Sequence, residues 1–103
     1  MKTISVEELK SKMNAGEKLQ LVDVREPDEN AAFNVGGTLV PLGKILSMQI
    51  EDIEDLKNEE VICYCRSGQR SMQACLMMET LGFTDVKNLT GGMVAWQEKY
   101  GKG

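Results

Sequence analysis

The sequence of 103 residues contains no histidine, and this absence removes several kinds of catalysis at once. Neither a Ser-His-Asp triad nor a Cys-His pair can form within the chain. No imidazole is present to bind a metal ion or to act as a general base. Any catalysis must therefore use carboxylates, lysine, tyrosine, cysteine or backbone groups.

Cysteine is also scarce, with three residues at Cys63, Cys65 and Cys75. This odd and small number differs from the even framework of a secreted, disulfide-stabilised domain, and no C-x-x-C redox motif is present. Without histidine or a second cysteine pair, a four-ligand zinc site would need carboxylates. The sequence therefore predicts no metal site, and reduced thiols in a cytoplasmic protein.

Basic residues are outnumbered, with 12 Lys and Arg against 16 Asp and Glu and a formal net charge of −4. Nucleic-acid binding normally requires a basic patch, so this balance argues against a nucleic-acid partner. No apolar run approaches the ~18 residues that a membrane span needs. The charged, amphipathic start of the chain does not resemble a signal peptide. We expect a single domain over residues 1–103 with no membrane partner.

Strand and helix patterns alternate along the chain. Ser5 and Glu8 form a capping box that predicts a helix from Val6 to near Gly16. Strands are predicted at residues 19–24, 38–40, 60–64 and 85–89, and further helices at 29–32, 42–56 in two pieces, 69–81 and 93–100. The inner face of helix 69–81 is expected to carry Met72, Cys75, Leu76 and Leu81. This alternation predicts an α/β fold whose mostly parallel sheet is covered by helices on both faces.

The strand at residues 60–64 is followed by the loop Cys65-Arg66-Ser67-Gly68-Gln69-Arg70-Ser71. Ligands of open α/β sheets bind beyond the carboxyl ends of the strands, where this loop lies. Five successive backbone N–H groups can curl around the cysteine sulfur, at the positive end of the next helix. Arg66 and Arg70 add two positive charges. Each effect favours the thiolate, so Cys65 is predicted to be a nucleophile that needs no histidine.

Three motifs, in this order, resemble those of the rhodanese family of sulfurtransferases. They are Leu21-Val22-Asp23-Val24-Arg25-Glu26, the loop from Cys65 to Ser71, and the closing stretch from Val86 to Trp96, which reads V-x-N-L-x-G-G-x-x-A-W. The resemblance covers nearly the whole chain. It implies a rhodanese-like three-layer sandwich, in which helices flank both faces of a five-stranded, mainly parallel sheet. One stretch departs from the family pattern, because Asn34 stands where a histidine is usual.

The resemblance implies a sulfurtransferase that needs no cofactor and works through a persulfide on Cys65. The implied donor is thiosulfate or a persulfide, and the implied acceptor is cyanide or a thiol. The substrate-binding residues carried over from the family loop are Arg66, Ser67, Gly68, Gln69, Arg70 and Ser71. Only four residues separate Cys65 from Arg70, whereas related folds that act on phosphate or arsenate have five. The shorter loop suits a single outer sulfur atom.

Ser67 is small and neutral at a loop position where a cation would help to hold thiosulfate, so weak activity with thiosulfate is expected. Two other functions remain open. One is a persulfide sulfur carrier that works with a donor or acceptor protein. The other is a thiol redox sensor, in which Cys63 or Cys75 resolves an oxidised Cys65. The loop favours the first two functions over the sensor.

Several residues near the loop have a structural interpretation that we favour. Asp23 and Arg25 are expected to form an ion pair rather than to contact substrate. Cys63 and Cys75 are expected to pack in the core. Met72, Met77, Met78 and Met93 are expected to fill the core and its rim, and Met77 or Met78, if partly exposed, would offer an apolar patch to a partner.

Overall fold

A computed structural model describes residues 1–102 of the chain. Five strands form one sheet in the order β1-β5-β4-β2-β3, and every neighbouring pair is parallel. The strands are β1 (Lys2–Ile4), β2 (Gln20–Asp23), β3 (Thr38–Leu39), β4 (Glu60–Tyr64) and β5 (Asp85–Leu89). The prediction of a five-stranded, mainly parallel α/β sheet is confirmed.

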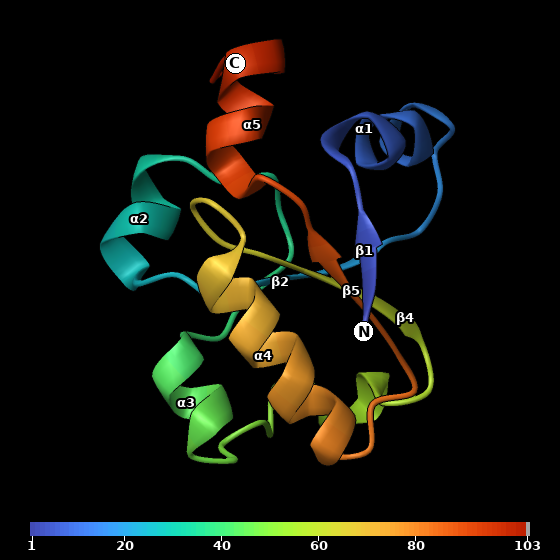
Figure 1. Cartoon of the computed structure of the whole chain (residues 1–103), viewed down its shortest axis with the longest axis vertical. Helices are drawn as coiled ribbons and strands as arrows, with labels where there is room; N and C mark the ends of the chain where they lie inside the picture. Colours follow the sequence, from blue (N-terminus) through green and yellow to red (C-terminus); the bar gives the residue numbers. More distant parts are fainter. Residues whose placement is uncertain (103) are drawn as a thin grey trace.

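Helices cover both faces of this sheet. They are α1 (Val6–Asn14), α2 (Pro27–Ala32), α3 (Leu42–Leu46), α4 (Gln69–Thr80) and α5 (Gly92–Tyr100), with a short 3-10 helix at Glu54–Leu56. Figure 1 shows α1 and α5 above the strands and α3 and α4 below them. The result is the three-layer arrangement that the motifs imply.

The central strand β4 separates two hydrophobic cores, because successive side chains of a strand point to opposite faces. Val61 and Cys63 pack in the core beneath α3 and α4. Ile62 and Tyr64 pack in the core on the opposite face, beneath α1 and α5. All four side chains are fully buried. Burial on both faces explains why this strand is a continuous apolar run in the sequence.

The edge strand β1 is not predicted by the sequence pattern. It has only three residues, and the side chains of Lys2 and Thr3 are exposed, so no alternation of apolar and polar residues is visible. Its register comes from pairing with β5, where Lys2 Nζ also donates to Asp85 Oδ1 at 3.0 Å. Tertiary contacts rather than local sequence therefore define this strand.

The helix that follows β1 begins as predicted. The hydroxyl oxygen of Ser5 accepts the backbone N–H of Glu8 at 3.1 Å, and the Glu8 carboxylate accepts the N–H of Ser5 at 3.2 Å. This reciprocal pair satisfies two of the free N–H groups at the start of α1.

The prediction for the inner face of α4 is wrong for two of its four residues. Met72 and Leu76 are 40% and 52% exposed. The buried residues of this helix are Ser71, Ala74, Cys75 and Met78. The buried stripe is thus shifted by one residue, because α4 turns Ser71 rather than Met72 toward the end of β4.

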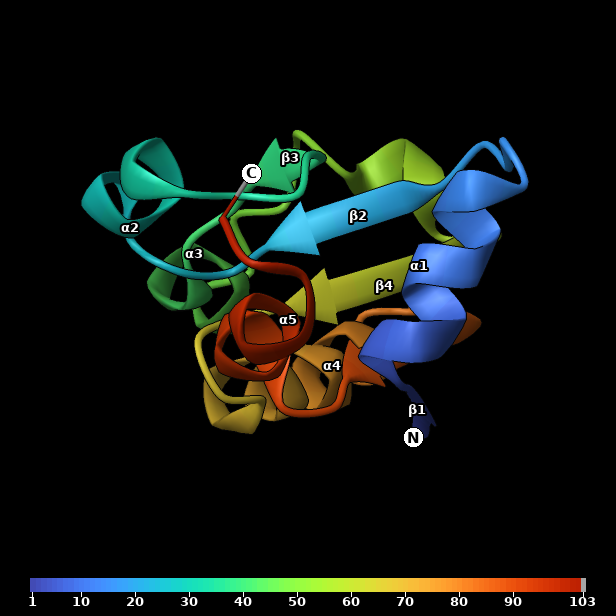
Figure 2. The same ribbon diagram turned by 90° about the horizontal axis from the view of Figure 1, so that it is seen from above.

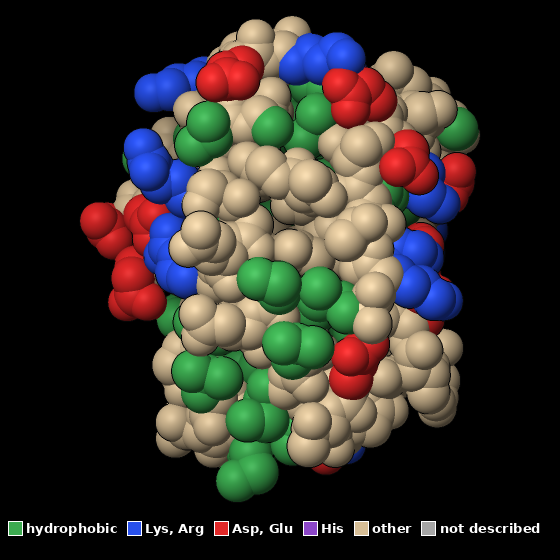
Figure 3. Space-filling view, viewed as in Figure 1, with side chains coloured by type: hydrophobic (Ala, Val, Ile, Leu, Met, Phe, Trp, Pro, Cys, Tyr) green, Lys and Arg blue, Asp and Glu red, His purple; other side chains and the backbone are tan. Residues whose placement is uncertain are grey.

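Four of the five exposed large apolar residues form a patch on the face that α3 and α4 present to solvent, and the fifth is Met1. Figure 3 shows apolar side chains gathered there, and the exposed ones are Leu46, Met48, Met72 and Leu76. Met77 is partly buried and packs against the core beneath α4, whereas Met78 is fully buried. Met77 is therefore the partly exposed one of the two, but the patch is made mainly of residues other than Met77 and Met78.

Within residues 1–102, none of the helices combines the length and the apolar character that crossing a membrane requires.

Candidate active site

Cys65 lies at the carboxyl edge of the sheet, where β4 ends and the loop to α4 begins. Figure 1 shows this loop in yellow, between α2, α4 and the start of α5. In Figure 2 the arrows of β2 and β4 point toward the side where α2 lies. The loop therefore occupies the position at which open α/β sheets bind their ligands.

The first turn of α5 holds the backbone of this loop in place. The N–H groups of Met93 and Val94 donate to the carbonyl oxygens of Cys65 and Arg66, each at 2.9 Å. Gly92 makes this close approach possible, because a Cβ atom there would lie 2.4 Å from the Cys65 carbonyl oxygen. Its φ of +54° also lies in the left-handed region, which favours glycine.

Three donors surround the sulfur of Cys65, a residue that is 1% exposed. The N–H groups of Gly68 and Ser71 donate to Sγ at 3.1 and 3.4 Å, and the Ser71 hydroxyl lies 3.3 Å from it. Of the five N–H groups expected from the sequence, those of Gly68, at 3.1 Å, and of Ser67 act on the sulfur. The sulfur rests against the first turn of α4, and this position brings Ser71 within reach instead.

These contacts favour the thiolate form of Cys65. Burial of the sulfur raises the pKa of the thiol, but hydrogen bonds from Ser71, Gly68 and Ser67 outweigh burial and lower the pKa below its ordinary value. The contributions from Ser71 come from both its hydroxyl and its N–H group. The direction of the shift is the one that the loop sequence predicts.

Asn88 of β5 extends this network, although the sequence did not single it out as a site residue. The Ser71 hydroxyl lies within hydrogen-bond distance of Asn88 Oδ1 as well as of Cys65 Sγ, and its one proton can be donated to either acceptor. Asn88 Nδ2 donates to the carbonyl oxygen of Gly68 at 3.0 Å. Asn88 is 7% exposed and Ser71 is fully buried. The available signal is its place in the closing motif V-x-N-L. The other polar residues of β5, Asp85 and Lys87, are only half-buried, whereas Asn88 is buried.

Arg70 does not present a free positive charge, contrary to the prediction. Its Nη1 and Nη2 donate to Glu29 Oε1 and Oε2 at 2.7 and 2.8 Å. These hydrogen bonds, opposed by partial burial, lower the pKa of Glu29 to about 2. Arg66 is exposed and forms no ion pair within residues 1–102, so it is the loop cation without a carboxylate partner. Sequence reasoning missed Glu29, which lies 41 residues before Arg70.

Asp23 and Arg25 form the ion pair that the sequence analysis favours. Arg25 Nε and Nη2 donate to the two carboxylate oxygens of Asp23, both at 2.9 Å. Asp23 also accepts from Asn30 Nδ2 at 2.9 Å, and Arg25 Nη2 donates to the carbonyl oxygen of Phe33 at 2.6 Å. Both members of the pair are buried, and they join β2 to α2 and the segment after it.

The other two cysteines lie in the core between the sheet and α4, as expected. Cys63 and Cys75 are fully buried, and Cys63 Sγ lies 3.5 Å from Met78 Sδ. Hydrogen bonding to Cys75, together with burial, raises the pKa of the Cys63 thiol well above its ordinary value. All three cysteines are free thiols.

A family model described as "Rhodanese-like domain" matches residues 5–99 of the chain. The chain belongs to the rhodanese-like family. The putative sulfurtransferase YtwF of Bacillus subtilis is 40% identical to it over 99 residues, which cover 94% of this chain and 91% of YtwF. The human thiosulfate:glutathione sulfurtransferase is 31% identical, and the alignment covers 94% of each protein.

A solved structure agrees with this assignment. The crystal structure of a rhodanese-like domain protein from Staphylococcus aureus is 33% identical and has a TM-score of 0.81, over 93% of this chain and 91% of that one. The family resemblance drawn from the three motifs is thus confirmed. This rhodanese-like domain is a member of a sulfurtransferase family.

The departure at Asn34 leaves the loop of this rhodanese-like domain well ordered by local hydrogen bonds. Asn34 Nδ2 donates to the carbonyl oxygen of Asn30, and its Oδ1 accepts the N–H of Gly36, both at 2.9 Å. The Tyr64 hydroxyl anchors the same segment by donating to the Gly36 carbonyl oxygen at 2.9 Å. None of these atoms contacts the sulfur of Cys65, so the substitution does not reach the nucleophile.

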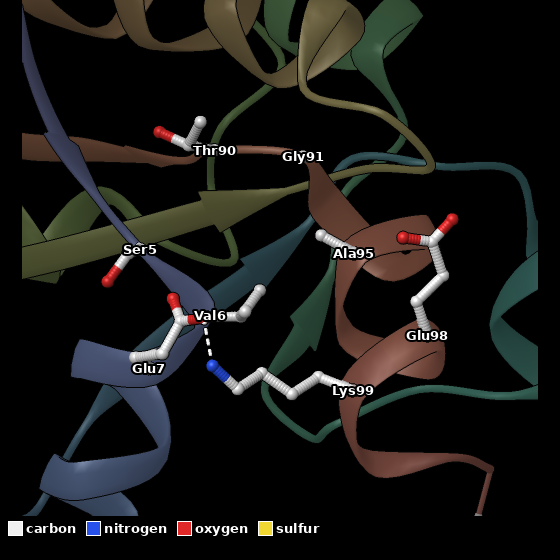
Figure 4. Close-up of a pocket in the computed structure, with 8 residues that line it drawn as sticks. All are labelled: Ser5, Val6, Glu7, Thr90, Gly91, Ala95, Glu98 and Lys99. Atoms are coloured by element: carbon white, nitrogen blue, oxygen red, sulfur yellow. Dashed lines mark hydrogen bonds and ion pairs between the residues drawn. The ribbon is translucent and has the colours of Figure 1, made fainter.

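A groove of about 490 Å³ lies between the start of α1 and one side of α5 (Figure 4). The ion pair between Glu7 and Lys99 crosses it, and Cys65 does not line it. A smaller groove of about 240 Å³ adjoins the loop and is lined by Arg25, Glu29 and Arg66, among other residues. Within residues 1–102, no group of three or more Cys, Asp or Glu side chains could hold a metal ion.

Proposed function

We propose that this rhodanese-like domain transfers sulfane sulfur through a persulfide on Cys65. The observation that carries the proposal is the position of its sulfur, which is held by the N–H groups of Gly68 and Ser71 and lies beside the Ser71 hydroxyl. The lowered pKa of Cys65 provides thiolate, the form that attacks sulfur.

The reaction consists of two balanced half-reactions. The Cys65 thiolate attacks the outer sulfur of thiosulfate, a new S–S bond forms, and sulfite leaves with the electron pair of the bond that breaks. An acceptor such as cyanide or a thiol then attacks the outer sulfur of the persulfide, and the Cys65 thiolate leaves. Such covalent catalysis gives ping-pong kinetics.

The loop residues have separate roles in this mechanism. Gly68 and Ser71 donate to the sulfur and stabilise the anion before attack and after each half-reaction. Arg66 attracts and orients anionic donors, since its guanidinium is exposed and has no carboxylate partner among residues 1–102. Ser67 and Gln69 are exposed at the rim and are proposed to contact the donor.

Steady-state kinetics test the proposal. Thiosulfate, or a persulfide such as glutathione persulfide, is the donor, and cyanide is the acceptor that yields thiocyanate. We expect parallel double-reciprocal plots for the wild type and no thiocyanate from Cys65→Ser. Cys75→Ser is the matched control, because it removes a thiol that lies in the core and should retain turnover. Turnover by Cys65→Ser would overturn the mechanism.

A protein-to-protein sulfur carrier is the second candidate function. The patch on α3 and α4 favours it, because the exposed side chain of Met72 follows Ser71 directly and offers an apolar contact beside the loop. A carrier would form a stable persulfide but would turn over small acceptors slowly. The rate at which Cys65 is loaded with sulfur, compared with the rate at which cyanide removes that sulfur, distinguishes the two functions. Fast loading with slow removal indicates a carrier.

A redox sensor has less support from the geometry. Cys63 and Cys75 are fully buried, and the thiol of Cys63 has a raised pKa. A resolving thiol must approach an oxidised Cys65 as a thiolate, and burial opposes that form.

A further inference from the structure

The guanidinium of Arg70 is fully engaged by a single carboxylate. Both of its terminal nitrogens donate to Glu29, in a two-pronged pair with distances of 2.7 and 2.8 Å. Such bidentate pairs are among the strongest charge-assisted hydrogen bonds. An anion that arrives at Cys65 therefore meets a paired guanidinium at this point of the loop.

Glu29 is also held by its own segment. Its Oε1 accepts the backbone N–H of Glu26 at 3.0 Å, which fixes the carboxylate at the start of α2. Its side chain is 27% exposed and that of Arg70 is 35% exposed, so the pair lies at the surface, and Glu29 lines the small groove beside the loop. Because Glu29 has a pKa of about 2, the carboxylate stays charged at neutral pH.

The other cations near the loop do not replace Arg70. Arg25 lines the small groove, but it is 5% exposed and its guanidinium is already bound by the Asp23 carboxylate. Arg66 and Lys102 are left to bind an anion, and they line the same small groove as the Glu29 carboxylate. Without Glu29, the Arg70 guanidinium would attract a dianion about twice as strongly as a monoanion, because the Coulomb energy scales with the charge.

We propose that Glu29 determines donor specificity, because by occupying Arg70 it disfavours small dianionic donors such as thiosulfate relative to monoanionic persulfides. This inference rests on the proposed sulfur transfer. The loading step is the same for both donors: the thiolate attacks the outer sulfur, the S–S bond of the donor breaks, and sulfite or a thiolate leaves with the electron pair. Only the charge that accompanies the sulfur differs.

Glu29→Gln tests the proposal, with Asp28→Asn as the matched control. Asp28 lies beside Glu29 in α2 and is exposed, and its replacement removes one negative charge without touching Arg70. The measurement is kcat/KM for loading Cys65 from thiosulfate and from a small alkyl persulfide, at one pH and ionic strength. We expect Glu29→Gln to raise the value for thiosulfate about tenfold, mainly through KM, and that for the persulfide less than about threefold. Asp28→Asn should leave the ratio of the two unchanged.

An Arg70→Gln background shows whether Glu29 acts through Arg70. There, Glu29→Gln should change the thiosulfate value less than about twofold. An equal change in kcat/KM for both donors, or the same gain for thiosulfate in the Arg70→Gln background, would overturn the proposal. Glu29 would then serve only to connect α2 to the loop. If Glu29→Gln does not fold, Glu29→Asp replaces it in the test, because its shorter side chain weakens the bidentate pair. We expect an intermediate gain in kcat/KM for thiosulfate, and the absence of a gain would contradict the proposal. Failure of every donor to load the wild type would instead refute the proposed function.

Discussion

At the scale of single residues, hydrogen bonding rather than net charge prepares Cys65. Ser71 is the central residue, because its N–H and its hydroxyl both lower the pKa of the thiol. The neighbouring Arg70, which would otherwise add a positive charge, is paired with Glu29. The nucleophile therefore depends on short-range donors that a conservative substitution can remove.

Ser71→Ala should raise the pKa of Cys65 and slow its alkylation by iodoacetamide about tenfold at neutral pH, since hydrogen bonds to a charged group contribute ~1.5–3 kcal/mol. The rate rises with pH and levels off above the pKa, so the wild-type profile should level off at lower pH than that of the variant. Ser67→Ala, which removes an exposed hydroxyl from the same loop, is the control. Coincident profiles for wild type and Ser71→Ala would contradict this account.

The sequence identifies Cys65 but not all of its surroundings. A cysteine at a strand end, followed by Gly68 and Arg70, is a local pattern that can be recognised from adjacent residues. Asn88 and Glu29 reach the loop from 17 residues after Ser71 and 41 residues before Arg70, and only the folded chain brings them there. The same limit applies to the charge of Arg70, which the sequence predicts to be free.

At the scale of elements, two helices besides α4 hold the loop. Glu29 joins α2 to the loop through Arg70, and the first turn of α5 binds the carbonyl oxygens of Cys65 and Arg66. Capping residues define where α1 begins, and the sequence predicts that start correctly. The rotation of α4 depends on packing against the sheet, and this is why its buried face is predicted one residue out of place.

Gly92→Ala should displace the loop and destabilise the domain by about 2–4 kcal/mol, because the added methyl group would clash with the Cys65 carbonyl oxygen at a left-handed φ. Sulfur loading should fall with it. Gly43→Ala in α3 is the matched control, since a Cβ there meets no atom within 4 Å. It should raise stability by up to ~1 kcal/mol. Urea unfolding measures both changes, and a Gly92→Ala variant as stable as wild type would disprove this role of α5.

At the scale of the whole molecule, one parallel sheet with a core on each face places the three thiols in different environments. Cys63 and Cys75 lie inside the core beneath α4, whereas Cys65, although 1% exposed, lies at the edge of that core and begins the loop whose Arg66 and Ser67 are exposed. The alternation of strands and helices is enough to predict this architecture. The edge strand β1 is the exception, since its pairing with β5 leaves no local pattern.

The three cysteines should therefore differ in reactivity. In the folded protein, iodoacetamide should label Cys65 through local opening of its loop, while Cys63 and Cys75 should react only when the domain unfolds. Mass spectrometry of wild type should show one label under native conditions and three in denaturant. Cys65→Ser should show no label under native conditions and two labels in denaturant. A disulfide between Cys65 and either core cysteine after peroxide treatment would favour the redox sensor instead.

The central claim is that Cys65 carries the sulfur, and the intact mass of the protein tests it most directly. Wild type and Cys65→Ser are incubated with thiosulfate, and separately with a small alkyl persulfide. Their intact masses are measured by mass spectrometry before and after treatment with cyanide. We predict that the wild type gains the mass of one sulfur atom and loses it to cyanide, whereas Cys65→Ser gains nothing. A wild type that gains no sulfur from either donor, or a Cys65→Ser variant that gains it, would contradict the account.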